Sequence, residues 1–196
     1  MKRTSNTAAR KVGREAKPNV EPVVAEQPGS WHLARSETER RLSEFEFGLE
    51  RLAQAYYRWK AACLAAVCDV PLTGDDVAVL NVVRMGDEPK RLSEIGQLLN
   101  RVDVPNLQYA TRKLVRAGLI ETEGSSSRKE TRYRATTRGR SVTEAYAALR
   151  AATLPPMLDA LDGWAAKSET ARIQLELISS LYAQAAQVAI TRRHQP

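Results

Sequence analysis

The chain of 196 residues has few of the groups on which most enzymes depend. It contains only two histidines, His32 and His194, and no run of histidine, cysteine and acidic residues with the spacing of metal ligands. A glycine-rich phosphate loop and a nucleophile elbow are missing from the sequence as well. We therefore expect no catalysis, no cofactor and no metal.

Cysteines and long apolar runs are also scarce. Cys63 and Cys68 make no disulfide framework, and five residues apart on a helix they point to different faces. The longest purely apolar run, residues 61–68, falls far short of the roughly 20 residues that span a bilayer. No apolar stretch follows the basic N-terminus as a signal peptide requires. These features predict a soluble, cytoplasmic protein without a membrane partner.

Positive charge is in excess. The 30 Lys and Arg residues outnumber the 23 Asp and Glu residues, and the net charge of +7 favours a polyanionic partner. Most of this excess lies in residues 101–140, where ten basic residues stand against four acidic ones. Residues 1–30 are basic without a periodic apolar face and are predicted to form a disordered tail. Such a tail is either a solubilising leader or an arm that contacts phosphates.

A heptad stripe predicts a long helix within residues 31–70. Apolar and aromatic side chains recur there at alternating steps of three and four; they are Leu42, Phe45, Leu49, Leu52, Tyr56, Trp59 and Cys63. A stripe this narrow packs lengthwise along another helix. The partner is either a second copy of the chain or the chain's own C-terminal helix.

Short helices follow in residues 71–140. The segment from Thr73 to Asp76 predicts a capping box, and residues 92–99 a short amphipathic helix. A third helix opens with Asp103 as a cap and Pro105 in its first turn, and Gly118 closes it. Its expected inward side chains are Leu107, Ala110, Thr111 and Leu114.

After Gly118 the apolar period changes to two. Residues 119–123 and 131–135 flank a Gly-Ser bend, which is typical of a β-hairpin. Alternation puts Tyr133 and Ala135 on one face of the hairpin, and Arg132 and Arg134 on the other.

Helices are predicted for the C-terminal part, residues 141–196. Thr137 is expected to cap the first of them, and the pair Pro155-Pro156 to kink or break it. The last helix, about residues 168–191, has an apolar face too broad for solvent, so we expect it to be sandwiched between other helices.

Two short helices with a tight turn, a third with a polar side and a basic hairpin make, in this order, a winged helix-turn-helix. With its flanking helices, the chain resembles the MarR family of bacterial transcription regulators over most of residues 35–190. The matching motifs are Leu92-Ser93-Glu94-Ile95-Gly96-Gln97-Leu98-Leu99, Leu107 through Gly118-Leu119-Ile120, and Ala135-Thr136-Thr137-Arg138-Gly139. The expected fold is mainly α with a small β-hairpin wing.

The resemblance implies an obligate homodimer that holds two recognition helices and two wings against double-stranded DNA. It divides the chain into an N-terminal dimerisation helix (31–70), the DNA-binding domain (71–140) and C-terminal dimerisation helices (141–196). Arg91 departs from the family, because Ser or Thr commonly caps the first motif helix there. Ser127-Arg128-Lys129 departs too, because it replaces an Asp-x-Arg signature and lacks the carboxylate that would orient a minor-groove arginine. Plain phosphate contact is the alternative at the wing.

The outer face of the third helix supplies the candidate base contacts. Asn106 and Gln108 carry amides that can bond an adenine edge bidentately, whereas basic side chains grip phosphates and set the register. The resemblance also puts Pro105 and Tyr109 at base-facing positions. The expected DNA contacts are Pro105, Asn106, Gln108, Tyr109, Arg112, Lys113, Arg116, Arg128, Lys129, Arg132 and Arg134. The alternative is a merely solvated helix face.

Regulation is less legible in the sequence. Many MarR family members bind small aromatic acids between the dimer helices and the winged domain, and Tyr56, Tyr57, Arg58 and Trp59 are candidates to line such a cleft. Ordinary interface packing explains the same aromatics, because Tyr56 and Trp59 belong to the heptad stripe. Redox sensing is the weaker hypothesis, since Cys63 lies on the stripe and Asp69 would raise the pKa of the Cys68 thiol.

The sequence therefore predicts a dimeric regulator that reads a pseudo-palindromic operator, with half-sites about one helical turn apart, roughly 34–36 Å. Repression by exclusion is the simplest action for a protein without an activation domain. Two alternatives remain: a sequence-independent architectural or nucleoid protein, and a winged helix that binds proteins only.

Overall fold

The computed structural model describes residues 32–124 and 131–193, so residues 1–30 and the wing residues Arg128 and Lys129 lie outside the described part. The elements follow one another as α1 (Glu37–Ala65), α2 (Gly74–Arg84), the 3-10 turn η1 (Met85–Asp87), β1 (Lys90–Arg91), α3 (Leu92–Leu98), α4 (Val104–Arg116), β2 (Ile120–Glu123), β3 (Arg132–Ala135), α5 (Thr137–Asp159) and α6 (Trp164–Arg193). The fold is mainly α with a small sheet, as the sequence predicts. None of the described helices has the length and apolarity that crossing a membrane demands.

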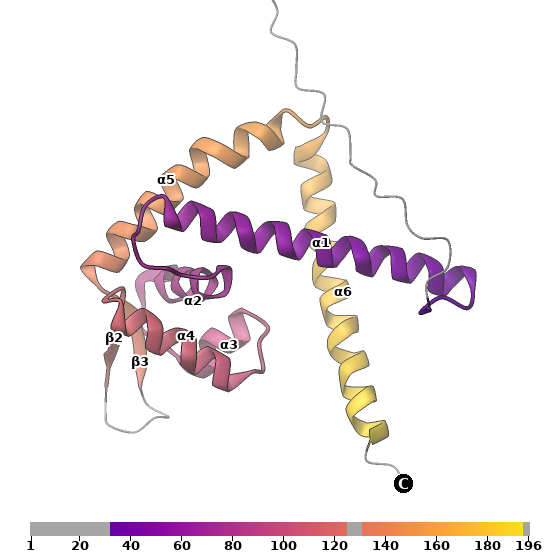
Figure 1. Ribbon diagram of the computed structural model, residues 1–196, viewed down its shortest axis with the longest axis horizontal. Helices are drawn as coiled ribbons and strands as arrows, with labels where there is room; N and C mark the ends of the chain where they lie inside the picture. Colours follow the sequence, from indigo (N-terminus) through magenta and orange to yellow (C-terminus); the bar gives the residue numbers. More distant parts are fainter. Residues whose placement is uncertain (1–31, 125–130, 194–196) are drawn as a thin grey trace, which may run out of the picture.

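Three long helices frame the winged domain. Figure 1 shows α2, α3, α4 and the strands grouped below the C-terminal half of α1. Helix α5 leaves the strands and rises past α1, and α6 turns back and crosses α1 near its middle. The C-terminal end of α6 therefore lies on the same side of α1 as the winged domain.

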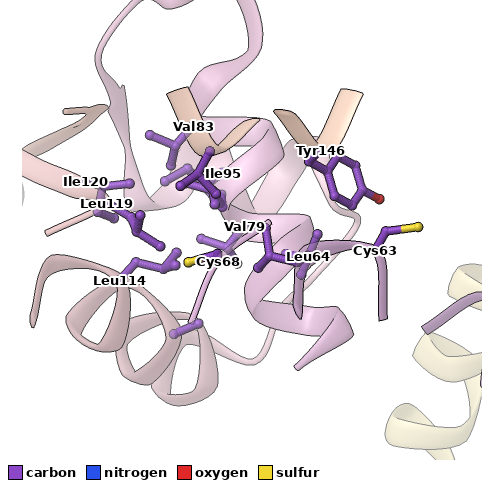
Figure 2. Close-up of a cluster of buried hydrophobic side chains, with 14 of the residues drawn as sticks. Cys63, Leu64, Cys68, Val79, Val83, Ile95, Leu114, Leu119, Ile120 and Tyr146 are labelled. Carbon is purple, nitrogen blue, oxygen red and sulfur yellow. The ribbon is translucent and has the colours of Figure 1, made fainter. Parts of the chain in front are cut away.

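The hydrophobic core belongs to the winged domain and the ends of the helices that leave it. Buried apolar side chains come from the end of α1, from α2, α3 and α4, from β2 and from the start of α5. The largest fully buried ones are Leu64, Leu80, Ile95, Leu107, Leu114, Leu119 and Ile120. Both cysteines are free and buried, and Figure 2 shows Cys63 at the edge of this cluster near Tyr146.

The heptad stripe of α1 is largely uncovered within one chain. Helix α1 is a single element of 29 residues, begun by Ser36, whose hydroxyl accepts the Glu39 amide at 3.3 Å. Among the stripe residues Cys63 is buried, whereas Leu42, Phe45, Leu52 and Tyr56 are exposed. The stripe therefore packs on the core only at its C-terminal end.

The wing is a three-stranded antiparallel sheet in the order β1-β3-β2. The predicted hairpin is confirmed, with Ile120 opposite Ala135 and Glu123 opposite Arg132. Strand β1 was not predicted, because two residues after Pro89 are too few to show a period. Pairing of Arg91 with Arg132 ties the start of α3 to the wing.

In α5 the expected cap is wrong, and the expected break at the two prolines does not occur. Thr136, not Thr137, caps the helix: its backbone is extended and its hydroxyl accepts the Gly139 amide at 3.0 Å. Pro155 and Pro156 do not break the helix, which continues to Asp159. The prolines lie in its last turns, and the carbonyls of Ala151 and Ala152, which lose their amide partners, belong to exposed residues that water can reach.

Within one chain, helix α6 is not sandwiched between other helices. It is 30 residues long, and its apolar side chains Ile173, Leu175, Leu177, Leu181, Val188 and Ile190 are all exposed. Its described polar contacts to other elements are the Tyr182 hydroxyl on the Glu46 carboxylate at 3.1 Å and the Asn100 amide on the Ser179 hydroxyl at 2.9 Å. The helix thus touches both α1 and the turn before α4.

The start of α5 permits only glycine at position 139. A Cβ on Gly139 would lie 1.9 Å from the Leu119 carbonyl oxygen, which also accepts the Thr136 amide at 3.1 Å. We expect Gly139→Ala to lower the free energy of unfolding by about 3 kcal/mol or more, because backbone must move to relieve the clash. Urea denaturation followed by circular dichroism measures this loss.

Gly48→Ala is the matched control. Gly48 is an exposed helical residue of α1, and a Cβ there meets nothing within 4 Å. This variant is expected to stabilise the protein by up to about 1 kcal/mol, through helix propensity alone. Equal effects of the two substitutions would contradict the close approach at Gly139.

Candidate nucleic-acid interface

Helix α4 has one face in the core and one in solvent. Its buried residues are Leu107, Ala110, Thr111 and Leu114, the inward set that the sequence predicts. The Thr111 hydroxyl donates to the Leu107 carbonyl at 3.0 Å, so its burial leaves no polar atom unpaired. Gly118 follows the helix with a φ of +66°, the left-handed conformation expected of a residue that closes a helix.

The solvent face of α4 carries most of the candidate DNA contacts. Pro105, Asn106, Arg112 and Arg116 are exposed, and Tyr109 is 61% exposed although it is aromatic. Gln108 is half-buried. The fold therefore brings the expected base-facing residues together on one side of one helix.

The N-terminus of α4 is held by an ion pair. Asp103 occupies the N-cap position without a side-chain cap; its carboxylate instead accepts two bonds from the Arg101 guanidinium, at 2.5 and 2.9 Å. Asp103 is thus the N-cap residue, as expected, but its carboxylate does not cap a backbone amide, because a charge-assisted bidentate pair outcompetes that bond. Arg101, with help from the Asn106 side chain, holds the pKa of Asp103 well below its usual range. Asn106 thus lies next to a fixed anion.

Two of the basic side chains expected to grip phosphates already have acidic partners. The Lys113 ammonium donates to the buried Asp76 carboxylate at 2.7 Å. Arg134 contacts Glu121 at 2.8 Å and Glu123 at 2.6 Å, and these pairs raise the pKa of its guanidinium. The Arg134 pairs follow from the hairpin register, whereas the Lys113 pair joins residues 37 positions apart, and no local pattern signals it.

Three other basic side chains are exposed and form no ion pair among the described residues. Arg112 and Arg116 are exposed and form no ion pair within the part of the chain that the structure describes. Arg132, on the wing, is exposed and donates one bond to the Pro89 carbonyl at 3.1 Å. Arg112 and Arg116 lie on α4, and Arg132 lies on β3.

Comparison with known proteins identifies the domain. Residues 72–139 match a family model described as "Winged helix DNA-binding domain". A search of curated proteins finds no sequence that matches. Among solved structures, AbfR of Staphylococcus epidermidis is similar at 18% identity, with 76% of this chain and 96% of that chain covered and a TM-score of 0.59. The MarR family regulator Sco5413 of Streptomyces coelicolor has 20% identity, 71% and 95% coverage and a TM-score of 0.57.

A mutant MarR from E. coli, solved in complex with operator DNA, has 19% identity, 74% and 99% coverage and a TM-score of 0.56. This chain is a winged helix protein with the MarR family fold. The long helices α1, α5 and α6 are therefore part of the matched architecture and not an addition to an isolated winged helix.

The departure from the MarR pattern at Arg91 has a structural reason. The Glu94 carboxylate accepts a bond from the Arg91 backbone amide at 2.6 Å and one from the Arg91 guanidinium at 3.2 Å. Arg91 is also the last residue of β1. The backbone amide is thus satisfied from position 94, as in half of a capping box. A Ser or Thr is not required to start α3.

The aromatic cluster on α1 is organised around a residue that the sequence did not single out. Lys60 is only 4% exposed, and its ammonium lies 4.8 Å from the ring centroids of both Tyr56 and Tyr57. Tyr56 also stacks on Trp59 at 6.3 Å, and burial lowers the pKa of Lys60. In the sequence, Lys60 looks like an ordinary polar residue of a helix. Its burial becomes visible only in the folded structure. Arg58, the fourth expected cleft residue, is exposed.

Both cysteines are buried, and the surroundings of Cys63 disfavour the thiolate. Burial raises the pKa of the Cys63 thiol, and Cys68 is equally buried. A reactive sensor cysteine needs the opposite environment, with partial exposure and nearby positive charge. The described part of the chain brings together no group of His, Cys, Asp and Glu residues that could hold a metal ion.

Proposed function

We propose that this protein is a sequence-specific DNA-binding transcription regulator. The observation that carries the proposal is the solvent face of α4, where Asn106, Tyr109, Arg112 and Arg116 are exposed, together with Arg132, which is exposed on the wing strand β3. This face combines an amide that can read an adenine edge with cations for phosphates. The MarR fold supports it, because E. coli MarR, similar in structure, was solved with operator DNA.

The residues on this face divide the work. Asn106 and Gln108 supply amide groups for base edges, and Tyr109 offers apolar surface to a thymine methyl group. Arg112, Arg116 and Arg132 contact phosphates and set the register. Pro105, in the first turn of α4, lies at the groove, and the wing residues Arg128 and Lys129 add phosphate contacts. Arg134 contributes less, since its donors are engaged by Glu121 and Glu123.

The functional unit is a homodimer. Apolar side chains of α1 and α6, most of them exposed, line a groove of about 330 Å³, made by Leu42, Phe45, Ile178, Leu181, Tyr182 and Ala185. Monomeric proteins seldom leave so continuous an apolar surface in water. A second copy that covers it would place two recognition helices about one helical turn apart, roughly 34–36 Å, on a pseudo-palindrome. Binding near a promoter would then repress transcription by exclusion.

A small effector has a place to bind. A cavity of about 510 Å³ lies between α1, α6 and the turn before α4, with Phe45, Leu49, Asn100, Val102, Ile178 and Tyr182 in its lining. It suits a mostly apolar ligand with a few polar groups. The Tyr56–Trp59 cluster does not line this cavity. The proposed effector site is therefore this cavity and not the cleft on α1 that the sequence led us to expect. A ligand here would press on the turn that leads into α4.

Selection of bound fragments from a random DNA pool near physiological salt tests the function. We expect a pseudo-palindrome bound at least about 10³-fold more tightly than random DNA. Bound DNA without sequence preference would favour an architectural protein instead. No binding at all would favour a winged helix that recognises proteins.

Substitutions separate base readout from phosphate contact. Asn106→Ala should cost about 1–3 kcal/mol on the selected site and relax the preference at one base pair. Arg132→Ala should weaken all sequences about equally and make the salt dependence of log Kd shallower by about 0.9. Fluorescence anisotropy over a salt series measures both.

Arg134→Ala is the matched control for Arg132→Ala, because the two arginines share a strand and Arg134 is already paired with two glutamates. Its effect on the salt slope should be the smaller of the two. Identical losses for Asn106→Ala on selected and random DNA would contradict the assignment of Asn106 to base readout.

Charges in the apolar groove should dissociate the dimer. Leu42→Glu with Leu181→Glu puts a carboxylate on each helix at positions that are 50% and 54% exposed in one chain, so the monomer fold should tolerate them. Burial of these charges in a dimer is costly. Sedimentation should report monomers for this variant and dimers for Ser180→Glu, a control at an exposed polar position of α6 outside the groove lining. A dimer that survives both groove charges would refute the placement.

A further inference from the structure

The first turn of α2 carries two acidic residues: Asp75 contacts Arg101 in the turn before α4, and Asp76 contacts Lys113 on α4. Asp76 belongs to the capping box predicted from the sequence: its carboxylate accepts the Thr73 amide at 2.8 Å and the Thr73 hydroxyl at 3.0 Å. The same oxygen, Oδ2, accepts the Lys113 ammonium at 2.7 Å. One carboxylate oxygen thus joins the start of α2 to the last turns of α4.

The contact between Lys113 and Asp76 is not an ordinary surface ion pair. The Asp76 side chain is 5% exposed and that of Lys113 28%, so water screens the pair poorly. Removal of Lys113 would leave a buried carboxylate with only neutral donors, which is costly. It is therefore unfavourable for Lys113 to leave Asp76 and contact a DNA phosphate instead. Its neighbour Arg112 is exposed and, within the described residues, has no acidic partner that it would have to leave.

The other end of α4 is tied to the same turn of α2. Arg101, just before the helix, contacts Asp75 at 3.3 Å while it holds Asp103 at 2.5 Å. Asp103 is the N-cap residue, and Asn106 helps Arg101 to lower the pKa of its carboxyl. The contacts of Asp75 and Asp76 therefore fix both ends of the helix that carries the candidate base-reading amide.

We propose that Asp75 and Asp76 form an acidic seat that sets the orientation of the recognition helix, with Arg101 and Lys113 as positioning residues and not phosphate contacts. The proposal rests on the proposed function, because it concerns how α4 meets the bases. Two anchors on one rigid helix turn restrict both tilt and rotation of α4. Sequence discrimination depends on that geometry, whereas non-specific attraction to phosphates does not.

DNA binding of matched variants tests the seat. Lys113→Met removes the charge and keeps most of the stem, and Arg112→Met makes the same change one position earlier on an unpaired residue. Lys113→Met should weaken the selected site by about tenfold or more and leave the affinity for random DNA and the salt slope unchanged. Arg112→Met should weaken all DNA and make the salt slope shallower by about 0.9. Asp76→Asn should reproduce the loss of discrimination, and Lys113→Arg should retain discrimination.

The double variant of Asp76→Asn and Lys113→Met should discriminate no worse than the more impaired single variant, because both single changes remove the same contact. Additive losses would overturn the seat. So would a Lys113→Met variant that behaves like Arg112→Met, since that result makes Lys113 a phosphate contact.

A measurement without DNA separates the seat from the proposed function. Amide hydrogen exchange in the free protein should be faster along α4 in Lys113→Met and in Asp76→Asn than in Arg112→Met, with circular dichroism as the check on folding. If the wild type binds DNA without preference, the proposed function fails and the exchange result alone decides the seat. Unchanged exchange along α4 in both variants would overturn the seat even if the wild type reads sequence.

Discussion

The packing of the inner face of α4 is the constraint on which the rest of the interface depends. Leu107, Thr111 and Leu114, which lie three and four residues apart along α4, are almost completely buried. The Thr111 hydroxyl donates to the Leu107 carbonyl of the same helix. A helix rotated by one residue would turn about 100° and bring Gln108 or Arg112 toward the core, at the cost of an unpaired polar group. The apolar stripe thus decides which side chains face outward, and the contacts of Asp75 and Asp76 adjust where that outward face is aimed. Burial of the inner face of α4 therefore determines which side chains the proposed DNA interface contains.

Positive charge on the winged domain is divided between architecture and exposure. Arg101, Lys113 and Arg134 have acidic partners on α2 or across the hairpin. Arg112, Arg116 and Arg132 remain exposed. A count of basic residues between positions 101 and 140 consequently overstates the charge offered to a polyanion. The partners matter because an arginine or lysine that must leave a carboxylate to meet a phosphate gains only the difference between the two contacts.

The sequence predicted what local pattern determines. The inward set on α4, the capping box at Thr73, the hairpin and Gly118 each depend on a few neighbouring residues, and each is confirmed. The features it missed depend on contacts between distant segments, such as strand β1 on β3, Lys113 on Asp76, and Lys60 between two tyrosines. The errors at Asp103 and Thr137 arose where two local partners compete for the same bond. The Asp103 carboxylate pairs with Arg101 and not with a backbone amide, and the hydroxyl that caps α5 belongs to Thr136 and not to Thr137. The DNA contacts themselves follow from exposure and residue type and stay predictions.

In the proposed dimer, the outer helices would connect the second copy to the helix that carries the candidate DNA contacts. Helix α6 extends past α1 toward the side of the winged domain (Figure 1), and its Ser179 accepts a bond from Asn100 in the turn that precedes α4. The same helix carries the apolar face that one chain leaves uncovered. A partner that fixes α6 would therefore also fix the turn, and through Arg101 and Asp103 the N-terminus of the recognition helix. Because the cavity lies between these same elements, a ligand in it would act on the distance between α6 and the turn. Dimer packing, effector binding and aim of the recognition helix would then be coupled through one contact surface and not through separate sites.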